Sequence, residues 1–219
     1  GVDEYWETPQ TLNETWGYSR FDTLWKTPEE VIQRLAEIVS KGGNYLLNIG
    51  PKGDGSIPEA SVKILQEVGK WMDKNSESIY ETSASPLALH DWGFCTAKDS
   101  ILYLHVTNWP ENNTLKIDGL KTKVVEANTL VGNKNLLVKQ SDIECSVSLS
   151  NVEPDAYNTV IKIELESFPE VAPMVISIEK GDTILLDNMT VSTLGKTKKR
   201  YNRRGKLFIS KWNSPKDNA

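Results

Sequence analysis

An amphipathic helix that leads directly into a short apolar strand is the strongest folding signal in the sequence. Residues 28–41 place apolar side chains at helical spacing, Thr27 is suited to cap the helix, and Pro28 fits its first position. Two glycines then end the helix, and the run 44–49 is apolar. Such a run is typical of a strand buried on both faces of a parallel sheet. The order of helix and buried strand predicts an α/β architecture.

A loop and a second helix continue this pattern. Residues 51–58 are rich in glycine and proline, and residues 58–75 again place apolar side chains along one side of a helix. The loop follows the carboxyl end of the predicted strand. That is the face where α/β barrels and open α/β sheets bind ligands.

After Tyr80 the pattern changes to short strands separated by turn residues, with no further helix. Such a series predicts an antiparallel β-sandwich. The predicted strands are 100–107, 114–117, 123–127, 147–149, 160–166 and 174–178, with weaker runs at 183–186 and 206–210.

These changes of pattern divide the chain into three parts. Residues 1–83 form the α/β part, residues 84–178 form the β-sandwich, and residues 179–219 are a linker or the start of a further domain that is cut off. The last part holds ten Lys and Arg residues against four Asp and Glu, although the whole chain has a net charge of −5. The acidic main body disfavours nucleic acid binding, and the basic cluster 196–206 predicts a solvated loop.

Other classes of protein are disfavoured by what the sequence lacks. No run approaches the roughly 18 apolar residues of a membrane span. No secretory signal opens the sequence, but a signal could have been lost with upstream residues. Cys95 and Cys145 lie about fifty residues apart, so we expect two buried free thiols. Neither His90 nor His105 has a partner at zinc-ligand spacing, so core or surface roles are expected for both.

Several motifs in order and spacing resemble the α-L-fucosidases of glycoside hydrolase family 29, over about residues 6–83. The motifs are Trp6-Glu7-Thr8-Pro9, Asn13-Glu14-Thr15-Trp16-Gly17-Tyr18, Val39-Ser40-Lys41-Gly42-Gly43-Asn44-Tyr45-Leu46-Leu47-Asn48-Ile49-Gly50-Pro51, Gly53-Asp54-Gly55-Ser56-Ile57-Pro58, Gly69-Lys70-Trp71 and Ile79-Tyr80. The resemblance implies a fold of class α/β plus all-β. It consists of the C-terminal portion of a (β/α)8-like barrel followed by an antiparallel β-sandwich, with the N-terminal part missing.

The resemblance also implies a retaining hydrolase that removes terminal α-L-fucose from fucosylated glycans or oligosaccharides. Retaining chemistry needs a nucleophile and an acid/base, two carboxyl groups about 5 Å apart. In the family the nucleophile is an aspartate upstream of the Trp-Glu segment, so we expect it outside this chain and expect the fragment alone to be inactive. No cofactor or metal is implied. Relatives act outside the cytoplasm, in the periplasm, at the cell surface or in lysosomes, and the oligomeric state stays open.

Three carboxylates are candidates for the acid/base. Asp22 occupies the position of a glutamate that one family subgroup has four residues after the equivalent of Tyr18, and its side chain is one methylene shorter. Glu7 is the alternative and Glu14 is a third candidate. Asp22 could equally be a loop or turn residue, and Glu7 could be a buried hydrogen-bond acceptor.

Three aromatic residues are candidates for sugar binding. The resemblance implies that Tyr45 forms an aromatic wall against the apolar face and methyl group of fucose. Trp6 and Trp16 could line the pocket, although each of the three could also be a core residue. Gln10 stands where some relatives have an arginine that contacts the sugar, which puts that contact in doubt.

Two other functions compete with the glycosidase. In one, the sandwich makes the chain a non-catalytic carbohydrate-binding protein. In the other, the chain is a degenerate glycosidase-like protein that has lost its acid/base.

Overall fold

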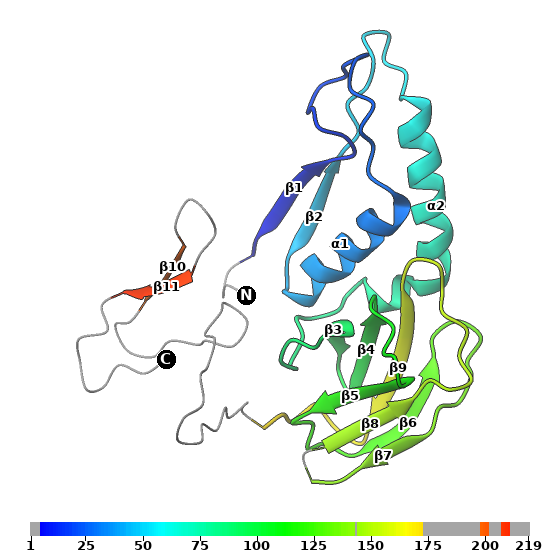
Figure 1. Cartoon of the computed structure of the whole chain (residues 1–219), viewed down its shortest axis with the longest axis vertical. Coiled ribbons are helices and arrows are strands. Elements are labelled where there is room, and N and C mark those ends of the chain that lie inside the picture. The colour runs from blue at the N-terminus through cyan, green and yellow to red at the C-terminus, as the bar shows by residue number, and fades with distance from the viewer. Residues whose placement is uncertain (1–4, 143, 173–197, 202–206, 211–219) are drawn as a thin grey trace. The chain divides into compact units, whose positions relative to one another are not determined.

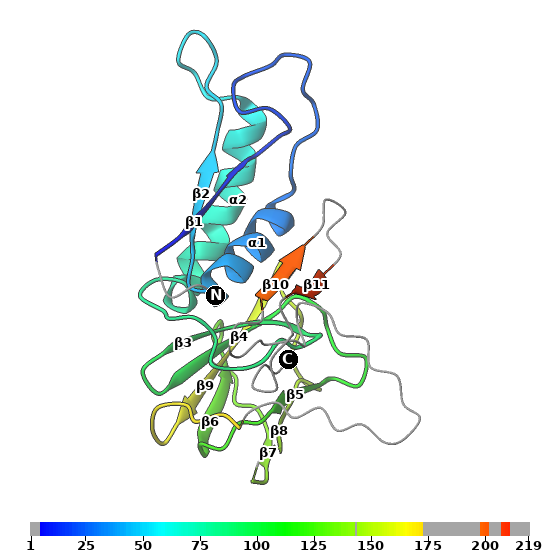
Figure 2. The ribbon, with the colours of Figure 1, turned by 90° about the vertical axis from the view of Figure 1, so that its left-hand side faces the viewer.

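The computed structural model describes residues 5–142, 144–172, 198–201 and 207–210. It divides into two units, Gly1–Met174 and Val175–Ala219, and each is described by itself. The first unit contains a pair of parallel strands with two long helices, followed by two antiparallel sheets (Figures 1 and 2).

The parallel pair and its helices form the α/β part. Strands β1 (Glu7–Thr11) and β2 (Asn44–Asn48) pair in register from Glu7 with Asn44 to Thr11 with Asn48. Parallel strands need a crossover connection, and helix α1 (Pro28–Ser40) provides it. Helix α2 (Glu59–Asn75) follows β2 and leads into a short 3-10 helix, Ser76–Ser78. The two predicted helices and the predicted strand between them are confirmed.

The start of α1 is fixed by its own sequence. Thr27 Oγ1 accepts a hydrogen bond from the Glu30 N–H (3.1 Å), and Glu30 Oε2 accepts one from the Thr27 N–H (2.7 Å). This reciprocal pair is a capping box, so Thr27 is the N-cap that the sequence predicted. Apolar side chains on one side of the helix are buried: Val31, Ile32, Ala36 and Ile38. Gly42 follows the helix with φ +78°, a conformation that suits glycine.

Strand β2 is covered on one face only. Tyr45 packs into the cluster of Leu12, Val31 and Ile64 on the helix side, whereas Leu46 is 52% exposed. Successive residues of a strand point to opposite faces, and no described element lies over the face of Leu46. The prediction of a strand buried on both faces is therefore wrong for the described part of the chain.

Two antiparallel sheets form the rest of the first unit, with strand orders β3-β4-β9-β6 and β5-β8-β7 (Figure 2). Side chains of both sheets share one buried core that includes Leu104, Ile117, Val147 and Ile163, as expected for a sandwich. The strands β3 and β7 were not among those predicted. The strand bounds are β3 Gly93–Lys98, β4 Ile101–Val106, β5 Thr114–Asp118, β6 Val124–Thr129, β7 Val138–Gln140, β8 Glu144–Ser148 and β9 Thr159–Leu165.

The cysteines and histidines lie in or beside this sandwich. Cys95 and Cys145 are free and buried, which confirms the prediction for both thiols. His105 is fully buried and His90 is half-buried. Both histidines therefore contribute to packing.

The α/β part and the sandwich share a buried cluster. Trp71 of α2 and Ile32 of α1 are buried together with Tyr103 and Val160 of the sandwich. Trp71 Nε1 also donates a hydrogen bond to the backbone oxygen of Asn158 (2.9 Å). The domain boundary near residue 83 stays a prediction, since side chains from both sides of it pack into one cluster.

The described strands of the second unit are β10 (Lys198–Tyr201) and β11 (Leu207–Ser210), which pair antiparallel. The predicted strand at 206–210 is thereby confirmed. The basic cluster 196–206 is not wholly a loop, because β10 lies within it; strand pairing uses backbone groups and tolerates charged side chains on edge strands. The predicted strands at 174–178 and 183–186 lie outside the described residues.

Candidate active site

The carboxyl ends of β1 and β2 lie at one edge of the parallel pair, which we call the carboxyl edge (Figure 1). The loops 12–27 and 49–58 leave from this edge and contact each other. Asn48 Nδ2 donates a hydrogen bond to the Trp16 backbone oxygen (2.7 Å). Gly50 has φ +52°, and a Cβ there would lie 3.3 Å from the same oxygen, so glycine allows the close approach. In α/β barrels functional residues lie at this end of the strands.

Asp22 accepts three hydrogen bonds within loop 12–27. Its Oδ2 accepts from the Glu14 N–H (3.0 Å) and the Thr15 hydroxyl (2.9 Å), and its Oδ1 accepts from the Leu24 N–H (3.2 Å). Desolvation raises the pKa of Asp22, but the bonds from Thr15 and the backbone outweigh it, and the pKa lies below its ordinary value. In this state Asp22 is an ionised carboxylate that stabilises the loop.

Glu14 lies on the same loop and differs from Asp22 in its contacts. Its side chain is exposed and forms no hydrogen bond or ion pair within the described residues. The structure therefore brings two of the three candidate carboxylates, Asp22 and Glu14, to the carboxyl edge. Asp22 accepts hydrogen bonds from its loop, whereas the Glu14 side chain makes none among the described residues.

Glu7 and Trp6 lie at the opposite edge. Glu7 is the first residue of β1, a strand of five residues, or about 13 Å at roughly 3.3 Å per residue. The Trp6 oxygen accepts a hydrogen bond from the Asn44 N–H (3.0 Å), and the Trp6 indole covers Gly43 so closely that a Cβ there would clash with it. Neither residue is brought together with Asp22.

Trp16 is one of several large apolar side chains exposed on loop 12–27. Trp16 is 59% exposed, Tyr18 45%, Phe21 80% and Leu24 69%. The Arg20 guanidinium lies 4.6 Å from the centre of the Phe21 ring, a cation–π contact. Exposed apolar side chains on one loop make it a candidate contact surface. Trp16 was predicted from the sequence, whereas Phe21 and Leu24 were not, because apolar residues in a loop follow no period.

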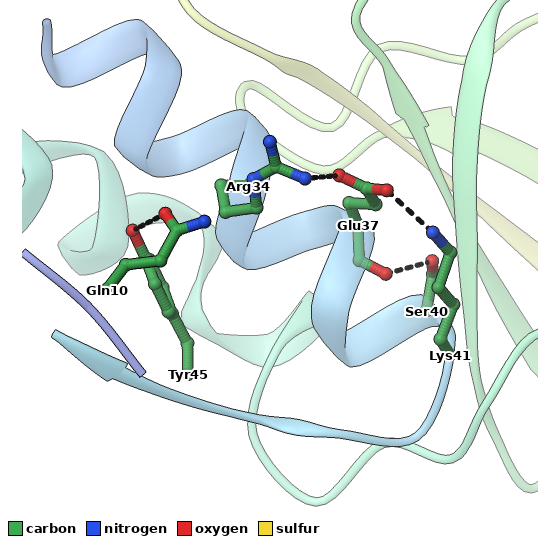
Figure 3. Close-up of polar contacts among 6 residues, drawn as sticks. All are labelled: Gln10, Arg34, Glu37, Ser40, Lys41 and Tyr45. Carbon is green, nitrogen blue, oxygen red and sulfur yellow. Dashed lines mark hydrogen bonds and ion pairs between the residues drawn. The ribbon is translucent and has the colours of Figure 1, made fainter. Parts of the chain in front are cut away.

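Tyr45 lies on the helix-covered face of β2, away from the exposed face. Its hydroxyl donates to Gln10 Oε1 of β1 (3.0 Å), and Figure 3 shows this pair below α1. Burial raises the pKa of the Tyr45 phenol, with the Arg34 charge acting in the opposite direction. The same view shows Arg34 and Lys41 both paired with Glu37 on α1. Contact of Tyr45 with a sugar stays a prediction that this placement does not favour.

Gln10 shares the helix-covered face with its partner Tyr45. Side chains alternate along β1, so Gln10 lies on the face opposite Pro9. Gln10, which stands where some relatives have an arginine, is thus half-buried and hydrogen-bonded to Tyr45.

The described residues contain neither a cluster of metal-ligating side chains nor a helix that could cross a membrane. No three His, Cys, Asp or Glu side chains come close enough there to hold a metal ion. Neither long helix has the length and apolar character that crossing a membrane requires.

Comparison with known proteins gives consistent matches. A family model described as Alpha-L-fucosidase matches residues 1–77. Tissue alpha-L-fucosidase of Homo sapiens is 34% identical over 165 residues, which are 70% of this chain and 35% of that protein. The chain thus spans about a third of the length of this curated relative.

Solved structures agree with the sequence matches. Alpha-L-fucosidase isoenzyme 1 from Paenibacillus thiaminolyticus is 37% identical, with a TM-score of 0.70 over 74% of this chain and 40% of that chain. A GH29 alpha-L-fucosidase from Bacteroides thetaiotaomicron, solved as a trapped covalent intermediate, is 29% identical, with a TM-score of 0.69 over 74% of this chain and 38% of that chain. By these sequence and structural matches, the chain belongs to the α-L-fucosidases of glycoside hydrolase family 29.

Proposed function

We propose that the protein carrying this chain hydrolyses terminal α-L-fucosyl linkages of fucosylated glycans with retention of configuration. Membership of the family supports the reaction class. The Bacteroides relative was trapped as a covalent intermediate with 2-fluoro-fucosyl fluoride. A covalent glycosyl-enzyme intermediate is the defining feature of the retaining mechanism.

Residues 1–83 supply the C-terminal portion of a (β/α)8-like barrel in this proposal. The order β1-α1-β2-α2 supports it, because alternating strands and helices with parallel pairing are the repeat of such barrels. In such a barrel further strands pair with the outer edges of β1 and β2, and the face of Leu46 lies toward the packed interior. The sandwich follows, and the protein acts outside the cytoplasm.

Asp22 is the proposed acid/base. It lies on loop 12–27 at the carboxyl edge, as Glu14 does, and of the two it alone occupies the position of the glutamate found in one family subgroup. In the first step a nucleophilic carboxylate from outside these residues attacks the anomeric carbon, the glycosidic bond breaks, and Asp22 gives its proton to the departing oxygen. In the second step Asp22 takes a proton from water, which attacks the same carbon and releases the nucleophile. The two steps together consume one water molecule.

The described state of Asp22 must change before it can act as an acid. Its carboxylate now accepts the Thr15 hydroxyl and two backbone N–H groups, which favour the ionised form. A glycan that docks against exposed Trp16 excludes water from the loop, and desolvation raises the pKa of a carboxyl group. Hydrogen bonds of catalytic groups often reach their working geometry only with substrate bound.

Two observations favour a second candidate, the degenerate glycosidase-like protein. Asp22 already has a structural role, and Gln10 is engaged with Tyr45. Measuring hydrolysis distinguishes a working glycosidase from a degenerate glycosidase-like protein.

The test is hydrolysis of 4-nitrophenyl α-L-fucoside and of a fucosylated oligosaccharide by the complete natural protein that carries this chain. Asp22→Asn should lose far more activity on the oligosaccharide than on the nitrophenyl substrate, because nitrophenolate leaves without a proton. Glu7→Gln, at the opposite edge, should keep its activity on both substrates. Glu14→Gln, measured on the same two substrates, tests whether Glu14 rather than Asp22 is the acid/base.

Thr15→Val is the matched control for a purely structural role of Asp22. It removes the donated hydroxyl bond and keeps the carboxylate. Loss of a bond that lowers the pKa of Asp22 should move the pH profile of hydrolysis to higher pH while activity survives. Equal losses for Thr15→Val and Asp22→Asn on both substrates would show that Asp22 only holds the loop. No hydrolysis by the folded wild-type protein would favour the degenerate candidate.

A further inference from the structure

A groove on the sandwich lies far along the chain from the carboxyl edge and has the composition of a ligand site. It has a volume of about 610 Å³ and lies between residues 89–92, the loop 108–112 and strand β5. Ligand pockets of proteins typically measure roughly 300–1,000 Å³. We propose that this groove binds a neutral carbohydrate chain, as a site separate from the active site.

Aromatic rings form one part of the groove, and the structure holds each ring in place. Trp109 Nε1 donates to Asn113 Oδ1 (2.8 Å), and Trp92 Nε1 donates to the Lys116 backbone oxygen (2.8 Å). The His90 ring lies 4.9 Å from the Trp92 ring. Trp92 is 6% exposed and packs in the core of the sandwich, so Trp109, which is half-buried, is the tryptophan that a ligand can reach. A ring fixed in this way loses little conformational freedom when a ligand binds, and its face suits the C–H face of a sugar.

The ring of His90 is fixed by the chain around it. Its Nδ1 lies 2.7 Å from the Ala88 oxygen, which can only accept, so Nδ1 carries the proton. The Nε2 atom then accepts the Asp118 N–H (3.4 Å). Trp92 and His90 thus satisfy backbone groups on the outer edge of β5, and the charged side chains of that strand are left for a ligand.

Charged side chains without protein partners form the other part of the groove. Asp91, Glu111, Lys116 and Asp118 line it, and their side chains make no hydrogen bond or ion pair within the described residues. Carboxylates accept hydrogen bonds from sugar hydroxyls, and an ammonium group donates to them.

The balance of charge selects the class of glycan. Three carboxylates and one ammonium give the groove an excess of negative charge, which repels sialylated or sulfated chains. The fixed ring of Trp109 beside free carboxylates therefore fits a neutral oligosaccharide. The site would hold glycan near the enzyme without contacting the bond that is cleaved.

The experiment follows the indole N–H signals of the full chain by NMR while the neutral trisaccharide 2′-fucosyllactose is added. The protein is produced in bacteria, so that the Asn-x-Thr sequon at Asn112 in the groove stays unmodified. We expect the Trp109 signal to shift with saturation, and 3′-sialyllactose to cause a much smaller shift. Trp109→Ala, followed through the remaining Trp92 indole signal, should weaken binding by roughly five- to tenfold, the range expected from loss of one aromatic contact.

Further variants keep the test independent of folding and of the active site. Glu111→Gln with Asp118→Asn changes exposed groups and should also weaken binding, while the exposed Glu126→Gln on β6 is the matched control and should not. Trp16→Ala removes the aromatic residue proposed for the active site and should leave this binding unchanged. No shift at Trp109, equal binding of the anionic sugar, or loss of binding in Trp16→Ala alone would each overturn the proposal. None of these outcomes depends on whether the complete protein hydrolyses fucosides.

Discussion

Protonation of His105 should couple the stability of the fold to pH. The ring is fully buried, Nδ1 lies 3.1 Å from Asn158 Nδ2, and Nε2 lies 3.4 Å from Thr96 Oγ1. The Thr96 hydroxyl donates to the Ser78 oxygen (2.7 Å), so it can only accept from Nε2. The hydrogen bonds therefore assign a neutral ring with its proton on Nε2 and an acceptor at Nδ1.

The size of the effect follows from the shift in pKa. Burial lowers the pKa of His105 from 6.5 to about 4, although the nearby backbone of Ser78 acts in the opposite direction. The pKa in the folded state lies below that in the unfolded state, so the stabilisation is complete above pH 6.5 and is lost as the pH falls toward 4. At about 1.4 kcal/mol per pKa unit, the total is about 3 kcal/mol, of which about 2 kcal/mol is lost between pH 7.5 and pH 5.0.

Urea unfolding of the full chain at pH 7.5 and at pH 5.0, followed by circular dichroism and tryptophan fluorescence, measures this difference. We expect His105→Gln to be less stable than the wild type at pH 7.5 and to lose about 2 kcal/mol less than the wild type on acidification. His90→Gln is the matched control. The pKa of His90 is also lowered, chiefly by burial, but this ring is only half-buried and its substitution should remove a smaller part of the pH dependence.

An unchanged pH dependence in His105→Gln would refute this reasoning. It would mean that the unfolded and folded states bind this proton equally well. A larger effect in His90→Gln would also contradict it, because the fully buried ring should carry the larger penalty.

Three further predictions concern local structure. Thr27→Ala removes the N-cap of α1 and should lower the free energy of unfolding by about 1 kcal/mol, measured by urea titration against the wild type. Gly43→Ala places a Cβ against the Trp6 ring and should cost about 1–3 kcal/mol and alter tryptophan fluorescence; an unchanged melt would show that Trp6 does not pack there. Burial raises the pKa of Cys95 to about 12 and of Cys145 to about 11, so neither thiol should react with Ellman's reagent until denaturant is added.

Local elements with a clear sequence signal could be predicted. The capping residue Thr27, the period of α1 and the glycines after it determine a helix from nearby residues alone. The strand β3 gave no such signal, because neighbouring residues Cys95, Thr96 and Ala97 are all buried and show no alternation. Whether a strand such as β3 is buried on both faces depends on the elements that pack against it, and the local sequence does not identify those elements.

The candidate site was predicted in part for the same reason. The family resemblance named Asp22, Glu14 and Trp16 as candidates, and all three lie on loop 12–27 at the carboxyl edge. It could not say that Asp22 accepts three hydrogen bonds from its own loop, because those donors depend on the path of the backbone. Nor could it assign Tyr45 to the helix-covered face, since a shift of one residue in the strand reverses the faces.

The central claim is that this chain supplies the acid/base of a retaining α-L-fucosidase. Its most direct test is azide rescue of Asp22→Asn in the complete natural protein, with 4-nitrophenyl α-L-fucoside as substrate and the product identified by NMR. We predict that azide restores turnover and yields α-L-fucosyl azide, because azide needs no base and attacks the covalent intermediate with net retention. No rescue, or a β-linked product, would contradict the assignment of Asp22.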